Sequence, residues 1–293
     1  MKKIFISILL ILVLISLGCK RFTTPDIEEP EVIEYHKGTQ GLEMSLIKNL
    51  PPGEIIEGGE FVIGLELRNK GAYDIKDGRI SIYGFEDGYV AIFQPDMYFN
   101  IEGKKPGFPE GGYEILNFEA KNIAIPEIAE KYSAPFTISA YYNYQTEAGI
   151  EVCINPNLYS YIRTKETVCE PETITTSGGQ GAPVAVTKVE EQFSPLGGSI
   201  KVNFVIHFAD KGDGKVVGGV RINEVRLSNV PISCETDYIE LKGKEEKYIL
   251  CTTETLPSAG SYIAPLSIKL SYDYTSKIDK TLNVRALRRL RES

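Results

Sequence analysis

The chain is built from short segments in which apolar and polar side chains alternate, the pattern of a strand with one buried face. In residues 264–275 the alternation is regular and places these side chains on the buried face: Leu266, Ile268, Leu270, Tyr272 and Tyr274. Residues 61–67 and 200–208 alternate in the same way. Glycine, proline, asparagine and aspartate separate such segments, and long helical periodicity is almost absent. The pattern predicts an all-β protein.

One of these segments occurs twice. APLSIKLSYDYTS at residues 264–276 has a near copy, APFTISAYYNYQT, at residues 134–146, in the same alternating register. The repeat also includes a tyrosine shortly before each Ala-Pro, so its structural positions are Tyr132, Pro135, Tyr142 and Tyr144 in the first copy and Tyr262, Pro265, Tyr272 and Tyr274 in the second. Each proline is expected at the start of a strand, where a missing ladder donor is tolerated.

The similarity extends upstream. GGEFVIGLELRNKG at 58–71 and GGSIKVNFVIHFADKG at 197–212 both run from a Gly-Gly turn through a strand into Asn/Asp-Lys-Gly. The repeat unit is therefore a whole domain of about 110 to 130 residues, a common size for one domain. Many short alternating strands predict two tandem immunoglobulin-like antiparallel β-sandwiches. Tyr262 resembles the tyrosine corner of such sandwiches, with Tyr132 as its counterpart; a half-buried interfacial tyrosine without that bond is the alternative.

The amino terminus is typical of a targeting segment. Lys2 and Lys3 precede the apolar run 4–17, which is too short for a comfortable membrane-spanning helix. The residues before Cys19 resemble the lipobox of bacterial and archaeal lipoproteins, although Ser16 stands where leucine is usual. We expect a lipid anchor on Cys19, with an uncleaved signal-anchor and ordinary secretion as alternatives. Each of these places the rest of the chain outside the cytoplasm.

Composition divides the chain further. The predicted segments are a signal peptide with a lipobox-like site (1–19), an acidic Pro-rich tether (20–40), β-sandwich domain 1 (41–156), a linker (157–181), β-sandwich domain 2 (182–285) and a basic tail (286–293). The Ser-Gly-Gly-Gln-Gly stretch at 177–181 is the expected hinge. Arg288 and its neighbours in the tail suit anionic headgroups, with a solvated terminus as the alternative.

Four cysteines remain after Cys19, an even number that suits an oxidising compartment. Three pairings are open. The local pairing, Cys153 with Cys169 and Cys234 with Cys251, closes two short loops, each worth ~3 kcal/mol in the chain-entropy model. A hairpin turn at Gly243 between residues 238–241 and 247–251 would bring Cys234 nearly opposite Cys251.

Charge and motifs limit the chemistry. With 32 basic and 40 acidic side chains the chain is net acidic, so nucleic acid is not expected as a partner. No nucleophile, zinc or phosphate-loop motif occurs, and the two histidines, His36 and His207, fall in the tether and on the polar face of a strand. We expect no catalytic residue, cofactor or metal site. DKGDG, with Asp210 and Asp213, predicts a hairpin turn, and a calcium loop is the alternative.

The passages at 49–61, 65–73 and 177–191 are similar to those of uncharacterised archaeal cell-surface proteins with tandem immunoglobulin-like (CARDB-like) β-sandwich domains. The resemblance implies a fold and a surface setting, and supplies no catalytic residue. The expected function is that of a non-catalytic, membrane-tethered structural or protein-interaction module of the cell envelope, on the outer face of the cytoplasmic membrane. Expected partners are the membrane, through the anchor, and other envelope proteins or surface glycans, for which outward Tyr141 is a candidate contact. The alternative is a glycan- or solute-binding surface lipoprotein.

Overall fold

A computed structural model describes residues 35–127, 129–156, 158, 167–196, 199–256 and 260–287. The chain divides into two units, Met1–Ile33 and Glu34–Ser293, and the fold given below is that of the second. The leader, Cys19 and most of the predicted tether lie outside the described residues, as do residues 288–293 of the tail. The described part contains strands and no helix, and hence no helix long and apolar enough to cross a bilayer. The all-β prediction is confirmed.

The described strands form three sheets. The first, in the order β1-β3-β7-β5, consists of β1 (Leu42–Leu46), β3 (Glu60–Asn69), β7 (Tyr113–Asn122) and β5 (Val90–Ile92). The second is ordered β14-β16-β11-β10-β9 and consists of β14 (Ser233–Cys234), β16 (Lys247–Leu256), β11 (Ser199–Asp210), β10 (Val184–Leu196) and β9 (Ile174–Thr175).

The third sheet, which we call the central sheet, is the largest. Its path β13-β12-β17-β8-β4-β6 consists of β13 (Val230–Pro231), β12 (Lys215–Leu227), β17 (Tyr262–Arg285), β8 (Lys131–Ile154), β4 (Ile75–Tyr83) and β6 (Asp96–Ile101), with β15 (Tyr238–Ile239) beside β12 and β2 (Ile55–Ile56) beside β17. All pairs on this path are antiparallel, and β2 pairs with β17 in parallel.

The alternation predicted the buried faces correctly. The inward set of β3 is fully or almost fully buried, as is that of β11: Phe61, Ile63, Leu65 and Leu67, and Ile200, Val202, Phe204, Ile206 and Phe208. A strand with a single apolar face buries that face by packing against another sheet. The alternation of apolar and polar residues therefore predicts which side chains lie in the core.

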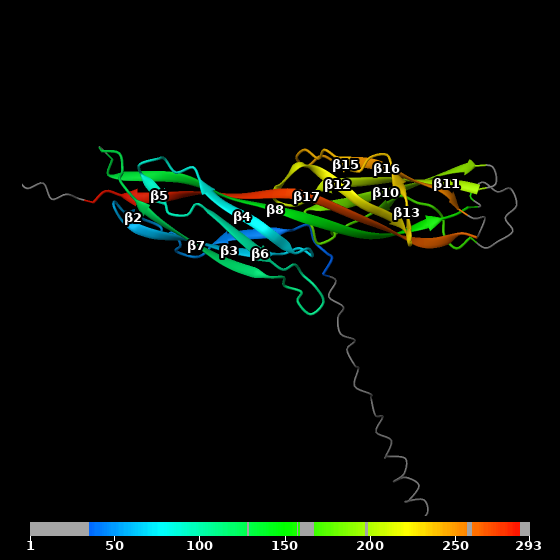
Figure 1. The fold of residues 1–293 in the computed structure, drawn as a ribbon, viewed down its shortest axis with the longest axis horizontal. Coiled ribbons are helices and arrows are strands. Elements are labelled where there is room, and N and C mark those ends of the chain that lie inside the picture. The colour runs from blue at the N-terminus through cyan, green and yellow to red at the C-terminus, as the bar shows by residue number, and fades with distance from the viewer. Residues whose placement is uncertain are drawn as a thin grey trace, which may run out of the picture. The chain divides into compact units, whose positions relative to one another are not determined.

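The repeated strings lie against each other. β8 and β17 each contain 24 residues and pair along their whole length, from Lys131 opposite Arg285 to Ile154 opposite Tyr262. Figure 1 shows the two strands side by side, with β3, β4, β6 and β7 beside one part of the pair and β10, β11, β12 and β16 beside the other. β4 pairs with residues 137–141 of β8, and β12 pairs with residues 266–275 of β17. Each long strand therefore serves both predicted sandwiches.

This pairing corrects one expectation about the domain organisation. The two halves are not joined through the linker alone, because each long strand begins in one half and ends in the other, and one hydrophobic core cluster contains residues of both. The expected hinge is also held in place: Gly181 N donates to Gly38 O at 2.8 Å, and Ala72 N donates to Gly181 O at 2.7 Å. The described end of the predicted tether thus belongs to the folded unit. The exact domain limits stay predictions.

Two further details differ from the sequence expectations. Pro135 and Pro265 lie inside strands rather than at their starts. Both positions fall just outside the stretches that pair with a second neighbour, 137–141 and 266–275, so the missing N–H costs no bond there. Residues 238–239 pair with β12 in the central sheet, so they do not form a hairpin with 247–251 around Gly243.

Candidate functional site

Four repeat tyrosines meet at the centre of the shared strand pair. Tyr142 lies opposite Tyr274, and Tyr144 lies opposite Tyr272. All four side chains point inward and are at most 3% exposed. Neighbouring ring centroids are 5.8 to 6.4 Å apart, in the tilted and edge-on arrangements that aromatic rings favour. We call these four residues the tyrosine cluster.

Two members of the cluster donate to the Asn/Asp-Lys-Gly turns. The Tyr144 hydroxyl donates to Asn69 Oδ1 at 3.0 Å, and the Tyr274 hydroxyl donates to Asp210 Oδ1 at 2.9 Å. The same two oxygens accept the N–H groups of Gly71 and Gly212, each at 3.1 Å. The turn signal read from the sequence is therefore also the anchor of the tyrosine.

Glycine is required in both turns. A Cβ on Gly71 would lie 2.0 Å from the Tyr144 hydroxyl, and one on Gly212 would lie 2.6 Å from the Tyr274 hydroxyl. No side chain fits at such distances, so the close approach of turn and tyrosine depends on glycine.

The other two members tie the outer sheets to the shared strands. Leu42 N, at the start of β1, donates to the Tyr142 hydroxyl at 3.1 Å. Val184 N, at the start of β10, donates to the Tyr272 hydroxyl, also at 3.1 Å. The cluster thus connects the central sheet to the first and the second sheet by the same bond.

Burial determines the ionisation of the cluster. Desolvation raises the pKa of Tyr142, Tyr144, Tyr272 and Tyr274 well above the ordinary value of a phenol, and nearby Asp210 raises that of Tyr274 further. The four hydroxyls therefore remain protonated at neutral pH. They act as neutral hydrogen-bonding groups.

The two halves differ in the group behind the tyrosine. In the first half Asn69 is neutral, and its Nδ2 donates to Tyr73 O at 2.7 Å. In the second half Asp210 is 1% exposed, and Lys244 Nζ lies 3.1 Å from its Oδ1. Lys244 Nζ also donates to the carbonyls of Gly212 and Gly214. No sequence pattern indicates this lysine as the partner of Asp210, because it lies 34 positions away in a loop.

Asp210 serves as this structural acceptor, which argues against the calcium alternative. The predicted hairpin is not formed either, because β11 and β12 lie in different sheets and the turn between them connects those sheets. Asp213 is exposed, and a pair of carboxylates of which one already accepts a tyrosine, a glycine and a lysine is a poor calcium cage. Within the described ranges, no group of three or more His, Cys, Asp and Glu side chains is placed to hold a metal ion.

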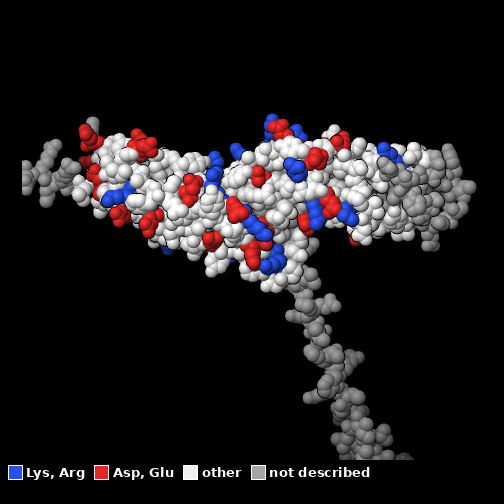
Figure 2. Space-filling view, viewed as in Figure 1, with Lys and Arg blue, Asp and Glu red and all other residues white. Residues whose placement is uncertain are grey.

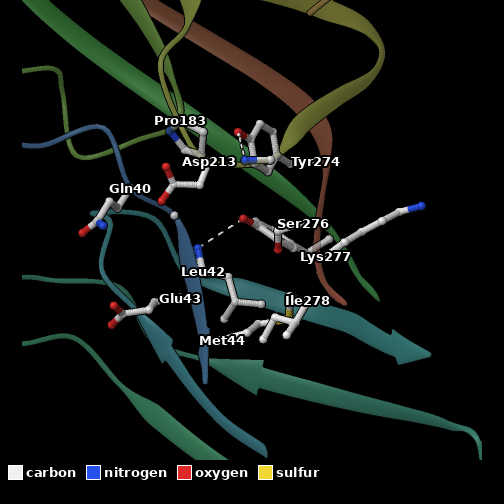
Figure 3. Close-up of a pocket in the computed structure, with 13 residues that line it drawn as sticks. Gln40, Leu42, Glu43, Met44, Pro183, Asp213, Tyr274, Ser276, Lys277 and Ile278 are labelled. Atoms are coloured by element: carbon white, nitrogen blue, oxygen red, sulfur yellow. Dashed lines mark hydrogen bonds between the residues drawn. The ribbon is translucent and has the colours of Figure 1, made fainter. Parts of the chain in front are cut away.

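A cavity of about 270 Å³ adjoins the cluster (Figure 3). Its walls come from residues 40–44 before and within β1, from Asp213 and Gly214, and from residues 276–278 of β17. The Ser276 hydroxyl is buried there and has no hydrogen-bond partner among the described residues. Its repeat counterpart Thr146 is bonded, with Oγ1 donating to Val184 O at 2.7 Å. The two halves therefore differ here: the Ser276 hydroxyl has no partner in the part of the chain that the structure describes, whereas the Thr146 hydroxyl is hydrogen-bonded.

Two more cavities lie nearby. One of about 470 Å³ and one of about 220 Å³ share His36, Glu147 and Gln180 in their walls. Both polar and apolar groups line these cavities, and His36 contacts the ring of Tyr35.

His207 is not the solvated residue that strand alternation predicts. Its side chain is 13% exposed and lies between two carboxylates, with Nδ1 2.9 Å from Glu246 Oε1 and Nε2 3.2 Å from Glu190 Oε1. The pKa of Glu190 is lowered, mainly by its hydrogen bond to Lys188 and to a smaller extent by His207. The outward face of β10 and β11 carries enough long side chains to cover the ring, which alternation cannot reveal.

Both predicted disulfides are present. The Sγ–Sγ distances are 2.09 Å for Cys153–Cys169 and 2.00 Å for Cys234–Cys251. Cys234 lies directly opposite Cys251, as the sequence predicted, but β14 rather than residues 238–241 supplies the partner strand.

A perturbed carboxylate lies beside the first disulfide. Cys153 N donates to Glu191 Oε1 at 2.8 Å, while Glu191 Oε2 is buried without a partner among the described residues. Burial, opposed by that hydrogen bond and reinforced by Glu172, raises the pKa of Glu191 to about 7.

The expected tyrosine corner has a different form at Tyr132. The Tyr132 hydroxyl donates to the side chain of Glu86 at 3.3 Å, and its ring contacts Tyr89, so its bond is not to backbone. This favours the interfacial alternative at Tyr132. Tyr262 is half-buried at the start of β17.

Exposed tyrosines lie on the outer face of the central sheet. Tyr98 on β6 and Tyr141 on β8 flank Arg79 on β4, directly opposite it on either side, and are 69% and 39% exposed. A hydrogen bond to Asp273 raises the pKa of Tyr141. Figure 2 shows acidic and basic side chains interspersed on the face in view, with no continuous basic stripe.

No protein-family model matches the chain, and no curated protein matches it either. Among solved structures, the YadV chaperone is similar at 8% identity over 82% of this chain and 99% of that chain, with a TM-score of 0.20. The Escherichia coli chaperone DraB has 10% identity over 83% and 98%, with a TM-score of 0.19. The secreted serine protease VesC from Vibrio cholerae has 12% identity over 82% and 50%, with a TM-score of 0.22. Such low TM-scores mean that the strands superpose poorly, so these matches assign neither family nor function.

Proposed function

We propose that the protein is a non-catalytic, extracytoplasmic structural or protein-interaction module of the cell envelope, tethered to the membrane through its amino terminus. The observation that carries the proposal is the shared pair of 24-residue strands, fixed at its centre by the hydrogen-bonded tyrosine cluster. A continuous strand pair holds two sandwiches in one orientation. A rigid body with two separate outer surfaces suits a scaffold or a spacer.

The central polar groups support a structural role. At the tyrosine cluster the hydroxyls bond to Asn69, Asp210 and the backbone, and the lysine nearby bonds to the carboxylate. Groups consumed by internal bonds are not available to activate a substrate. The exposed row Tyr98, Arg79 and Tyr141 instead offers the large amphipathic side chains that protein interfaces favour.

The proposed location rests on the leader and the disulfides. Two disulfides persist in an oxidising compartment and are rare in a reducing one. The lipobox-like residues before Cys19 supply the proposed anchor. The likeness to archaeal surface proteins with tandem immunoglobulin-like domains agrees with this setting and stays a prediction.

Binding of a glycan or a small solute is the second candidate. The cavity of about 470 Å³, with His36, Glu147, Gln180 and Lys269 in its wall, favours it. A ligand that binds only the folded protein raises its melting temperature, by an amount that grows with the logarithm of ligand concentration above the Kd. A titration with envelope monosaccharides that raised the melting temperature would promote this candidate, and an unchanged melting temperature would leave the interaction role.

The test of location is protease treatment of intact cells that make the protein. We expect external protease to degrade the folded unit, and the protein to partition with membranes. A Cys19→Ser variant should leave the membrane fraction or retain its leader. Full protection from protease in intact cells, together with free Cys153 and Cys234 thiols, would contradict the proposal.

A further inference from the structure

The outer edge of β17 contains a gap between two neighbours. β8 covers one edge of β17 over its whole length. On the other edge, β12 pairs with β17 up to Thr275, and β2 pairs with it from Val284 onward. No described strand pairs with residues 276–283 on that edge. The gap is eight positions long, about 27 Å at ~3.4 Å per residue.

The backbone groups that face the gap can be identified. Arg285 O accepts Glu57 N at 2.9 Å on the outer edge, whereas Ala286 N donates to Glu130 O on the β8 side. Successive residues of a strand point their peptide groups to opposite edges. The odd-numbered residues of the stretch therefore face the gap: Lys277, Asp279, Thr281 and Asn283. Within the described part of the chain, no hydrogen bond reaches the peptide groups of these four residues from that edge.

The gap opens into the cavity of about 270 Å³. Ser276, Lys277 and Ile278 form part of the cavity wall, opposite Leu42 and Met44 of β1. Figure 3 shows Ile278 and Met44 among the side chains that line this cavity. An apolar side chain entering between the two sheets here would pack on Met44 and Ile278.

A lysine marks the middle of the gap. Lys280 belongs to the inward-facing set of β17, with buried Leu282 and Val284, yet it is exposed. It has no ion pair among the described residues. An inward-pointing charge protects an open edge from indiscriminate pairing, because a guest strand must supply the opposite charge.

We propose that the gap is a docking site for one extended segment of a partner protein, which adds to β17 as a strand with apolar side chains over Met44 and Ile278 and a carboxylate beside Lys280. The proposal rests on the interaction role proposed above and names the chemistry of the partner. The peptide hydrogen bonds supply affinity and the pockets supply specificity, as in other strand additions.

The length of the gap excludes a second copy of β17 as the guest. That strand continues for 24 residues, so its ends would collide with β12 and β2. A single segment of up to eight residues fits between them.

Residue-level hydrogen exchange on residues 20–293, which contain the whole described unit, tests the gap. The amides of Lys277, Asp279, Thr281 and Asn283 should exchange at least about a hundredfold faster than those of Ile278, Lys280 and Leu282, which bond to β8. Equal protection of both sets would overturn the proposal. A second result would also overturn it: slow exchange of the odd-numbered amides in residues 20–293, but fast exchange of the same amides in a shorter form that begins at Glu34. In that case residues 20–33 of the chain itself would fill the gap.

Titration with a synthetic peptide tests the guest. The probe is acetyl-Thr-Val-Thr-Val-Thr-Glu-Thr-amide, whose two valines and glutamate share one face. We expect it to slow exchange of the four odd-numbered amides, and a control peptide with lysine in place of glutamate to bind at least about tenfold more weakly. Thr281→Pro removes a gap-facing N–H without touching the β8 ladder and should weaken binding about tenfold, whereas Thr281→Ala should not.

Three results would contradict the docking site: no peptide binding by a protein with fast odd-numbered amides, equal binding of both peptides, or no effect of Thr281→Pro. These measurements use purified protein, so they do not depend on location in the cell. If the purified protein fails these tests but external protease degrades the protein on intact cells, the docking site is wrong and the proposed location stands. If the protein passes these tests but is fully protected from protease in intact cells, the docking site stands and the proposed location is wrong.

Discussion

Asn143 lies directly opposite Asp273, the residue that holds the same position in the second copy of the repeat. Their side chains are in contact, with Asn143 Nδ2 3.2 Å from Asp273 Oδ1. A residue paired with its own counterpart marks a local two-fold axis, and the tyrosine cluster is arranged around it: Tyr142 faces Tyr274 as Tyr144 faces Tyr272. The two copies of the repeated string are thus related by a local two-fold axis within one chain.

Loss of a cluster hydroxyl should destabilise the whole unit. Tyr274→Phe leaves Asp210 Oδ1 and Gly214 N without their tyrosine partner, at a cost of about 1 to 3 kcal/mol in the free energy of unfolding. Tyr144→Phe should cost a similar amount. Urea unfolding measures both. Tyr98→Phe on the exposed face is the matched control, and we expect it to change the free energy by less than about 0.5 kcal/mol. A control as costly as Tyr274→Phe would contradict this account.

Lys244 should be coupled to Asp210. Lys244→Met leaves a buried carboxylate without its ammonium partner and should destabilise by about 1 to 3 kcal/mol, less than a fully buried pair because Lys244 is half exposed. In an Asp210→Asn background the same substitution should cost much less, since Asn69 shows that an amide serves in that position. A double-mutant cycle by urea unfolding gives the coupling energy. Additive effects would show that the two residues act independently.

Glu191 should make stability depend on pH. Its pKa is raised to about 7 in the folded protein from an ordinary value of 4.5, so the folded state holds a proton that the unfolded state releases. Stability is therefore highest below pH 4.5 as far as this group is concerned, and falls as pH rises toward 7. Glu191→Gln keeps the acceptor for Cys153 N and should flatten the curve over this range. Parallel curves for the two proteins, measured by thermal unfolding, would refute the assignment.

Each disulfide should stabilise the unit separately. Replacing Cys153 and Cys169 together by serine should cost ~3 kcal/mol, and so should replacing Cys234 and Cys251. Peptide mapping without reductant checks the connectivity and should yield only these two linked pairs. A linked peptide that joins Cys153 to Cys251 would be incompatible with the strand register.

The sequence specified the faces of the strands better than their partners. Alternation located Phe136, Ile138, Leu266 and Ile268 in the core, and all are buried. Periodicity gives the direction of a side chain but not the strand beside it, so the pairing of the two copies with each other was not predicted. The same alternation continues in β8 beyond the repeated string, where Ala148 and Ile150 face inward and are buried.

The candidate site was predicted in part. The inward register of the four tyrosines follows from alternation, and all four side chains are buried. Their acceptors were not recognised: Asn69 and Asp210 read as turn residues, and local turn chemistry does not reveal a bond to a tyrosine more than 60 positions away. The cavity and the gap beside β17 depend on which strands are neighbours, so they required the structure.

Calorimetry of the folded unit tests most directly whether the two halves form one body. Ile63→Val on β3 and Ile206→Val on β11 each remove one buried methyl group, at a typical cost of 0.5 to 1.5 kcal/mol. Shared strands predict a single transition, with equal calorimetric and van't Hoff enthalpies, that both substitutions move to lower temperature. Two transitions, of which Ile63→Val shifts only one and Ile206→Val only the other, would contradict the account.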